Sequence, residues 1–384
     1  MLQRVVMFKG NFNYNVVNNF VDEIAKVLYA RGFEVIVIPI TNDEKMSQEI
    51  IAAFEFPVYF TVGFNGIGSD LRVDGKSLFD VYNTTFIHWL VDHPAAHFAR
   101  IEEPISKSIV ACIDDAHCDY MEKYYPDKIV TFIEHATSVE EQQKEKKFNI
   151  VFAGGLEDIE SITQQMQPLL DLIPNLLTDI INYSNESNFD LDTFKEYCLT
   201  KYAILHDIFM QNRVNIFAFL ILVDRYYRAY KREKILLKLL EEDYIVDYFG
   251  KLPKDSSLMN YHNFQLHKEV EYNDLTGIFL KSKVVLNIFP NFIRGGHERI
   301  FKAMACGAVI LTDSNEYITQ HFTEGFIEVS AESLDGEKLN RVLTDDIYRE
   351  SIVEKNTVKI KNYHLWDNRV DKLLYTVEEA KKYM

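Results

Sequence analysis

Residues 284–313, VVLNIFPNFIRGGHERIFKAMACGAVILTD, predict a strand, a glycine-bearing loop, a short helix and a second strand. Val284–Phe289 is an apolar, β-branched run, and Ala308–Leu311 is another. Between them, His297–Cys306 carries apolar residues on one side, and Gly307 stands where a helix commonly ends. Two strands joined by a helix predict a βαβ unit with a parallel sheet.

The start of this helix combines the features of an anion site. Gly295 and Gly296 precede free backbone N–H groups at the positive end of the helix dipole, which suits a phosphate. Arg294 and Arg299 flank that end and match the charge of a diphosphate. The same segment also contains Asn291, His297 and Glu298. An ordinary βαβ unit whose glycines only turn the chain is the alternative, but the glycine pair, helix start and two arginines together favour a diphosphate site.

The string GGHERIFKAMACGAVILTD resembles the signature of bacterial glycosyltransferases of the spore-maturation-protein (CgeB-like) type, a branch of the GT-B superfamily related to glycosyltransferase group 1. The residues that match this signature are Ser282, Lys283, Leu286, Asn287, Gly296, Arg299, Phe301, Ala303, Met304, Ala305, Gly307, Leu311, Thr312 and Asp313. Two positions depart from the pattern. Lys302 stands where many relatives place a glutamate that holds the ribose of the donor, and Arg294 replaces another common acid.

The resemblance implies an α/β fold of GT-B architecture. Two Rossmann-like domains with parallel sheets would face a central cleft, and a C-terminal helix would cross back to the first domain. The activity implied is transfer of a sugar from a nucleotide-diphosphate donor to a glycan, small-molecule or protein acceptor, with no bound metal or other cofactor. Lys302 and Arg294 leave two alternatives, a non-catalytic module that binds a glycan, nucleotide or protein, and a sugar-nucleotide epimerase.

Length and composition fit this two-domain plan. The chain has 384 residues, which is long for one hydrophobic core, and 47% hydrophobic residues, which excludes a disordered protein. A net charge of −17 argues against nucleic acid or an anionic membrane as the main partner. The N-terminus reads as a buried strand, and Val214–Val223 is too short to span a bilayer. Four cysteines without CxxC spacing suggest buried thiols, so we expect a cytoplasmic protein.

Alternating strands and helices indicate a parallel sheet in the N-terminal part. The predicted strands are Arg4–Phe8, Phe33–Pro39, Val58–Val62, Phe86–Val91, Ser108–Ile113 and Lys128–Phe132. The charged stretch Ser138–Lys147 predicts a linker. We therefore expect an acceptor-side domain over residues 1–140, a donor-binding domain with a helical insertion over 148–360, and a crossing helix over 361–384.

Ligands of open parallel sheets bind beyond the carboxyl ends of the strands. Six loops fall at such ends and are expected to converge on one cleft. They are Lys9-Gly10-Asn11, Gly63–Gly66 with Asn65, Asp92-His93-Pro94, Gly154-Gly155, Gly250-Lys251 and Asn291–Gly296.

Glycosyl transfer needs a group that takes a proton from the acceptor, and Asp92 and His93 are the best-placed candidates. The alternative is that Asp92 only caps the next helix. His88, His93 and His97 suggest a metal site, but Pro94 moves His93 away from helical geometry, and we predict no metal. The competing interpretation packs His88 inside its strand.

Three further features point less clearly to a function. His135, in a segment similar to one that abuts the donor in relatives, is either a donor contact or a hinge residue. Asp114-Asp115 is interpreted as a turn or helix cap, and the basic stripe Tyr226–Lys238 as a solvated helix face. Just before the last helix, which is expected from about Asn368 to Tyr383, Trp366 is expected to anchor the crossing to the first domain, with packing inside the second domain as the alternative.

Overall fold

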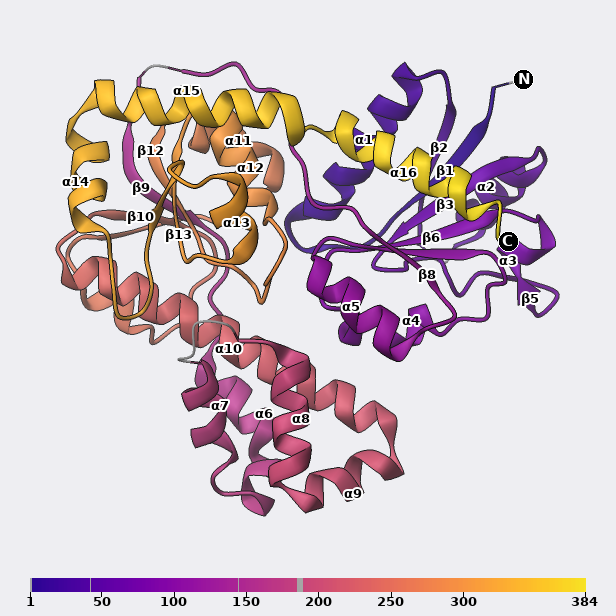
Figure 1. Cartoon of the computed structure of the whole chain (residues 1–384), viewed down its shortest axis with the longest axis horizontal. Coiled ribbons are helices and arrows are strands. Elements are labelled where there is room, and N and C mark those ends of the chain that lie inside the picture. Colours follow the sequence, from indigo (N-terminus) through magenta and orange to yellow (C-terminus); the bar gives the residue numbers. More distant parts are fainter. Residues whose placement is uncertain (1, 42, 144, 185–188) are drawn as a thin grey trace. The chain divides into compact units, whose positions relative to one another are not determined.

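The computed structural model describes residues 2–384 except 42, 144 and 185–188. The chain forms two compact units, which are coloured along the sequence in Figure 1. Unit 1 contains the residues up to Val139, together with Glu271–Asn273 and Lys361–Met384, and unit 2 contains Glu140–Val270 and Asp274–Ile360. Among the helices of the described residues, none is long and apolar enough to cross a membrane.

Unit 1 is built on a parallel six-stranded sheet with the order β2-β1-β3-β6-β7-β8. Its strands are β1 (Arg4–Lys9), β2 (Glu34–Pro39), β3 (Val58–Phe64), β6 (Thr85–Leu90), β7 (Ser108–Cys112) and β8 (Ile129–Phe132). The helical segments are α1 (Val16–Ala30), α2 (Glu44–Phe54), α3 (Leu78–Val81), α4 (Phe98–Ile101), α5 (Asp115–Tyr124), η1 (Asn13–Asn15) and η2 (Pro94–His97). A short hairpin joins β4 (Arg72–Val73) to β5 (Lys76–Ser77). The apolar runs expected from the sequence form the central strands, which are buried on both faces.

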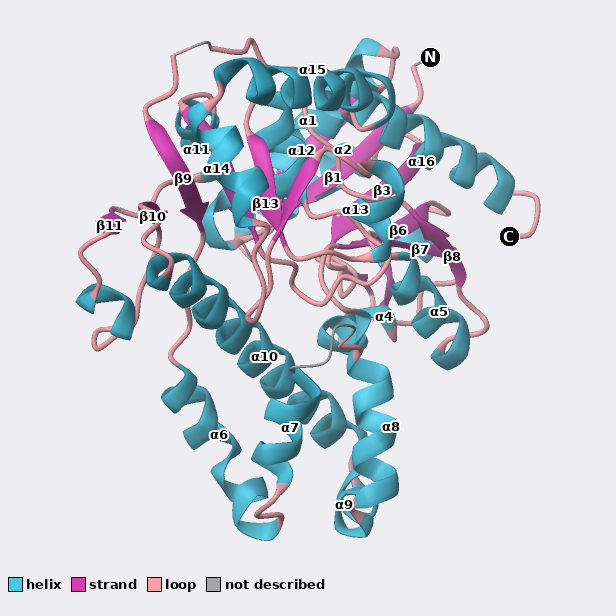
Figure 2. Cartoon of the chain, turned by 60° about the vertical axis from the view of Figure 1, so that its left-hand side comes forward, coloured by secondary structure: helices cyan, strands magenta, loops and turns pink. Residues whose placement is uncertain are grey.

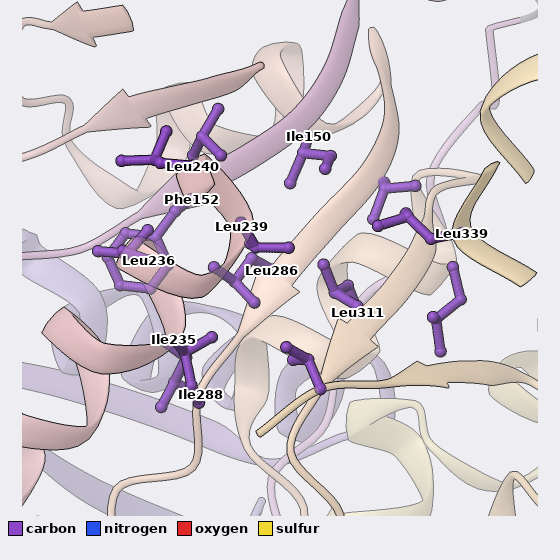
Figure 3. Close-up of a cluster of buried hydrophobic side chains, with 14 of the residues drawn as sticks. Ile150, Phe152, Ile235, Leu236, Leu239, Leu240, Leu286, Ile288, Leu311 and Leu339 are labelled. Carbon is purple, nitrogen blue, oxygen red and sulfur yellow. The ribbon is translucent and has the colours of Figure 1, made fainter. Parts of the chain in front are cut away.

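Unit 2 has a second parallel six-stranded sheet, with the order β11-β10-β9-β12-β13-β14. The strands are β9 (Phe148–Ala153), β10 (Val246–Phe249), β11 (Phe264–His267), β12 (Ser282–Asn287), β13 (Val309–Thr312) and β14 (Phe326–Glu328). The helical segments are α10 (Arg213–Glu241), η3 (Ser257–Asn260), α11 (Tyr272–Phe279), α12 (Glu298–Ala305), α13 (Glu316–His321), α14 (Gly336–Thr344) and α15 (Asp346–Tyr363). One face of the sheet buries Phe152, Leu286 and Leu311 against Leu236 and Leu239 of α10 (Figure 3).

Between β9 and the second half of α10, the chain forms a helical insertion. It contains α6 (Ile159–Leu172), α7 (Leu176–Ser184), α8 (Leu191–Lys201) and α9 (Ala203–Gln211). All four contact α10 and extend away from the sheet of unit 2 (Figure 2). Helix α10 therefore belongs to two hydrophobic cores. Its first half packs in the insertion, and its second half packs on the sheet.

The C-terminal helix α16 (Trp366–Ala380) returns to unit 1, as the sequence predicted. Its contacts with α1 include the ring of Trp366, whose centroid is 5.2 Å from that of Phe20. Arg369 is buried, and its guanidinium donates to the carbonyl oxygens of Glu134 and His135 at 2.9–3.0 Å. Trp366 therefore anchors the crossing in unit 1, and the alternative of packing inside the second domain is wrong.

Truncation after Lys361 is expected to unfold unit 1. The deletion removes the buried side chains of Trp366, Val370, Leu373 and Val377. Each contributes about 1.5–3 kcal/mol by burial, and the sum is comparable with the whole stability of a domain. Loss of amide protection in β1 and β3, measured by hydrogen exchange, is the expected result. Truncation after Ala380 serves as the control and keeps this protection, whereas equal protection in both variants would contradict the role of α16.

A buried histidine makes unit 1 sensitive to acid. His88 is fully buried in β6, and neither ring nitrogen has a hydrogen-bond partner among the described residues. Burial, with a smaller effect of Lys128, lowers the pKa of His88 to about 3. Between that value and an unfolded pKa of about 6.5, only the unfolded chain takes up this proton, so the free energy of unfolding falls as pH falls.

The loss expected from His88 alone is about 1.4 kcal/mol for each pH unit below about 6.5. Urea unfolding at pH 7 and pH 5 measures it, and a His88→Leu variant should lose about 2 kcal/mol less than the wild type across that interval. The matched control is the exposed His206, whose replacement by leucine also removes one histidine but leaves the buried ring in place. An identical pH dependence in His88→Leu and wild type would show that the buried ring is protonated in the native state.

Candidate functional site

In unit 2, the loops after β9 and β10 touch one another. The amide of Gly154 donates to the carbonyl of Phe249 at 3.0 Å. A Cβ on Gly250 would lie 2.1 Å from the carbonyl oxygen of Gly154, so only glycine fits there. Lys251 follows with an exposed side chain that pairs with Glu269 at 3.4 Å. The predicted loop residues Gly154, Gly155 and Gly250 therefore lie together, while the side chain of Lys251 is engaged with an acid.

Two arginines from different elements meet at this glycine loop. Arg232 of α10 donates through Nη1 to the carbonyl of Gly155 at 2.8 Å. Arg299 of α12 is buried, and its guanidinium lies over the ring of Phe152. It also lies beside Gly154, because a Cβ placed on that glycine would be 3.4 Å from Nη2 of Arg299. Its Nη1 donates to the amide oxygen of Asn287 at 3.3 Å, which is a neutral partner. The loop after β9 is thus lined by two guanidinium groups.

Some of the basic side chains near these arginines pair with a carboxylate, whereas Arg232 does not among the described residues. Asp224 pairs with Arg228 at 2.7 Å, and Asp313 pairs with Lys231. Burial would lower the pKa of Lys231, but Asp313 outweighs it and raises that pKa. No carboxylate pairs with Arg232 in the part of the chain that the structure describes, and burial together with Arg228 and Arg299 lowers its pKa to about 10. An anion bound here would relieve this excess of positive charge.

The N-terminus of α12 differs from the expected phosphate cradle. His297 caps the helix, with its Nδ1 accepting from the amide of Arg299 at 3.3 Å and its carbonyl accepting from Ile300 at 3.0 Å. Burial lowers the pKa of His297, while Oε2 of Glu298, 3.0 Å from the same Nδ1 atom, acts in the opposite direction. A Cβ on Gly296 would lie 2.4 Å from the ring of Phe301, so this glycine is required by packing.

The rest of the loop before α12 is held by hydrogen bonds to α10 and to Asn315. Asn291 has a left-handed backbone with φ of 60°, and its amide nitrogen donates to Asp224 of α10. Gly295 accepts a hydrogen bond from the side chain of Asn315 at 3.0 Å. Arg294 and Glu298 are half-buried. Asn291 therefore bonds to the helix that also carries Arg232, and Gly295 bonds to the residue that caps α13 (Glu316–His321).

Interpretation of the basic stripe as a solvated face was wrong. Tyr226 and Tyr227 are buried, and Arg228, Lys231 and Arg232 are half-buried in the site. The four-residue spacing of Asp224, Arg228 and Arg232 places them on one face of α10, a signal that the sequence contained. It was missed because the stripe lies far from the helix start at Glu298.

A second cluster lies at the carboxyl ends of the strands in unit 1. Asn65, with φ of 51°, follows β3 and donates through Nδ2 to Oδ2 of Asp92 at 3.0 Å. The Oδ1 atom of Asn65 accepts from the amide of Val91 at 2.8 Å, and its carbonyl accepts from Arg100 at 3.0 Å. Asp92 keeps 49% of its side chain exposed. Asn65 therefore fixes the orientation of a carboxylate that solvent can reach.

Three histidines surround Asp92, in different roles. His93 accepts from the amide of Ala95 at 3.2 Å and caps η2, so the capping function expected as an alternative for Asp92 belongs to His93. Nε2 of His97 lies 3.6 Å from Oδ2 of Asp92. His117 is buried against the ring of His93, and burial lowers its pKa to about 3 despite the nearby Asp92. Among the described residues, no group of three His, Cys, Asp or Glu could hold a metal ion.

The remaining predicted residues lie elsewhere in unit 1. A Cβ on Gly10 would lie 2.1 Å from Cδ1 of Ile67, so the loops after β1 and β3 touch, and Asn11 beside it is exposed. His135 is buried with its ring 5.2 Å from that of Phe20, and its carbonyl is held by Arg369. Asp114 caps α5 by accepting from Ala116 at 2.7 Å, which confirms its interpretation as a cap.

Comparison with known proteins agrees with this architecture. Residues 228–375 match a family model described as glycosyl transferase-like. No curated protein matches the chain in sequence. Sucrose-phosphate synthase from Thermosynechococcus elongatus is similar in structure, with 8% sequence identity and a TM-score of 0.59 over 100% of both chains.

Two further solved structures are similar to the whole chain. An alpha-glucosyltransferase in complex with UDP and a 13-mer DNA has 10% identity and a TM-score of 0.55 over 98% of this chain and 100% of the other. HepE from Anabaena, in complex with UDP-glucose, has 8% identity and a TM-score of 0.53 over 98% of this chain and 99% of the HepE chain. At these identities the likeness establishes the fold alone. The chain therefore has the GT-B fold, and its residues 228–375 are similar to a glycosyl transferase-like family.

Proposed function

We propose that the protein is a glycosyltransferase that moves a sugar from a nucleotide-diphosphate donor to an acceptor hydroxyl or side chain, with no bound metal. The observation that carries this proposal is the pair Arg232 and Arg299 at the Gly154-Gly155 loop, where no carboxylate pairs with Arg232 among the described residues. A diphosphate brings negative charge that two neighbouring guanidiniums attract. The UDP and UDP-glucose complexes of the two neighbours support the same donor class.

In this account the arginines act on the leaving group. When the bond between sugar and diphosphate breaks, negative charge grows on the departing oxygen. Arg232 and Arg299 are held in place by Gly155 and Asn287, so they need little reorganisation to stabilise that charge. A well-placed donor of this kind contributes roughly 3–4 kcal/mol to transition-state stabilisation. Their fixed charges would do the work that a metal ion does in other transferases.

We assign the proton acceptor to Asp92. Its carboxylate is half-exposed, and Asn65 holds it in one orientation by donating to Oδ2. His93 is the weaker candidate because its Nδ1 accepts from the amide of Ala95 and its ring packs between His117 and Tyr120. Asn65 and His97 then orient Asp92 rather than react themselves. The acceptor would be deprotonated as its oxygen or nitrogen attacks the sugar.

Hydrolysis of activated sugars in the absence of acceptor tests the proposal. Pure protein is incubated with UDP-glucose and related nucleotide sugars in the presence of a chelator, and release of the nucleoside diphosphate is measured. Slow release that Arg299→Ala abolishes supports a working transferase. Binding without release would identify a non-catalytic module, for which Lys302 in place of the usual acid is the motivating feature. Conversion of the sugar without release would identify an epimerase.

A further inference from the structure

A cavity of about 680 Å³ lies at the amino ends of the strands in unit 1. It is lined by the first residues of four strands, Arg4 of β1, Glu34 of β2, Val58 of β3 and Thr85 of β6. Asp92 follows the carboxyl end of β6, so this cavity and the predicted acceptor site lie at opposite ends of the strands of the same sheet. The volume is that of a small-molecule site, and no part of the proposed transfer reaction uses it.

Basic groups dominate the polar lining of this cavity. Arg4 and Glu34 neutralise each other through two hydrogen bonds of 2.8 and 3.0 Å. Lys107 donates to the neutral amide oxygen of Asn83 at 2.7 Å. Lys381, just after α16, lies 3.3 Å from the centroid of the Tyr59 ring. Lys381 also pairs with Glu378 at 3.6 Å, but Glu378 is not part of the lining. Among the charged side chains that line the cavity, Lys107 and Lys381 therefore add to a pair, Arg4 and Glu34, that is already neutral.

The other walls are apolar and open to solvent. Phe56 is 54% exposed and Leu2 is 67% exposed, although both line the cavity. Pro57, Val58 and the ring of Tyr59 extend this apolar surface between them. A ligand that covered Phe56 and Leu2 would gain roughly 25 cal/mol for each Å² of apolar surface removed from water.

We propose that this cavity binds an anionic amphiphile, an acyl chain that ends in a carboxylate. The carboxylate pairs with Lys107 and Lys381, and the acyl chain covers Phe56 and the Tyr59 ring. Because Lys381 follows α16 while Lys107 precedes β7, the bound molecule ties the end of the crossing helix to the sheet. Binding therefore stabilises unit 1, and it does so whether or not the protein transfers sugars.

Calorimetric titration of the full chain with decanoate, 1-decanol and decyltrimethylammonium tests the proposal. All three share one alkyl chain and differ in the charge of the head group. Decanoate is expected to bind saturably at one site, at least about tenfold more tightly than the alcohol, and the cation not at all. Lys381→Gln and Lys107→Gln should each weaken decanoate about five- to tenfold, and Phe56→Ala should weaken it similarly.

Lys382→Gln is the matched control, because Lys382 pairs with Glu379 and does not line the cavity. It should bind decanoate like the wild type. Lys381 and Phe56 are at least partly exposed, so these variants should fold, and circular dichroism checks this. The comparison of the three head groups also needs no variant. Equal binding of decanoate and decanol, the same loss in Lys382→Gln as in Lys381→Gln, or no saturable binding would each overturn the proposal.

Discussion

Replacement of Arg232 by methionine is expected to weaken binding of a nucleoside diphosphate by about 100-fold or more, close to 3 kcal/mol. The reason lies in its surroundings. Its guanidinium is positioned by the carbonyl of Gly155, and burial with two neighbouring arginines already lowers its pKa to about 10. The same substitution removes repulsion from Arg228 and Arg299, so the variant should unfold at an equal or higher temperature. Lower affinity with unchanged or higher stability is the result expected of a binding residue.

The same helix offers a matched control for this variant. Arg225 lies seven positions earlier on α10 and pairs with the carboxylate of Glu157 at 2.7 Å, so its charge is compensated by an acid, whereas Arg232 bonds to the neutral carbonyl of Gly155. Arg225→Met should bind the diphosphate like the wild type. Titration calorimetry measures the affinities, and thermal unfolding measures the stability. If Arg232→Met bound as tightly as Arg225→Met, the cluster would be structural and the donor site would lie elsewhere.

Asp92→Asn is expected to lower kcat by about 10²–10⁴-fold while leaving donor affinity unchanged. An asparagine can still accept the hydrogen bond from Asn65, so the loop after β6 keeps its geometry, but an amide cannot take the proton of the acceptor. Steady-state kinetics with the acceptor found by a substrate screen give kcat, and donor titration gives the affinity.

Asn65→Ser distinguishes positioning from chemistry in the same loop. It removes the group that orients Asp92 but leaves the carboxylate, so kcat should fall less than in Asp92→Asn, and the pH dependence of kcat should shift because Oδ2 loses a hydrogen bond. His93→Gln should retain most of kcat. A larger loss of kcat in His93→Gln than in Asp92→Asn would transfer the role of base to the histidine.

The fold was predictable wherever local pattern and tertiary structure agree. The apolar runs of residues 284–313 form β12 and β13, and the short helix between them ends before Gly307, with φ of 73°, as its one-sided pattern suggested. The crossing of α16 was predictable from Trp366 and the apolar stripe that contains Leu373 and Val377. Each of these signals lies within one helix or strand and therefore does not depend on what the chain does elsewhere.

The site was less predictable, because its charges come from distant parts of the sequence. In the sequence, the insertion α6–α9 separates Arg232 from the Gly154-Gly155 loop, but in the fold the second half of α10 packs on the sheet and Arg232 bonds to Gly155. Without that knowledge, α10 reads as one amphipathic helix with a solvated basic face. The cap of α12 by His297 was not predictable either, because histidine is not among the residues that usually cap a helix N-terminus. The bond between Asn65 and Asp92 joins two loops that only the sheet order makes neighbours.

The central claim is that unit 2 binds the diphosphate of a nucleotide donor through Arg232 and Arg299 without a metal ion. Titration calorimetry of the pure protein with a panel of nucleoside diphosphates and their sugars, in the presence of a chelator, tests it most directly. We predict saturable binding of at least one diphosphate, weaker by about tenfold or more for the corresponding monophosphate, and loss of this preference in Arg232→Met. No binding of any member of the panel at millimolar concentration, or binding that the chelator abolishes, would contradict the account.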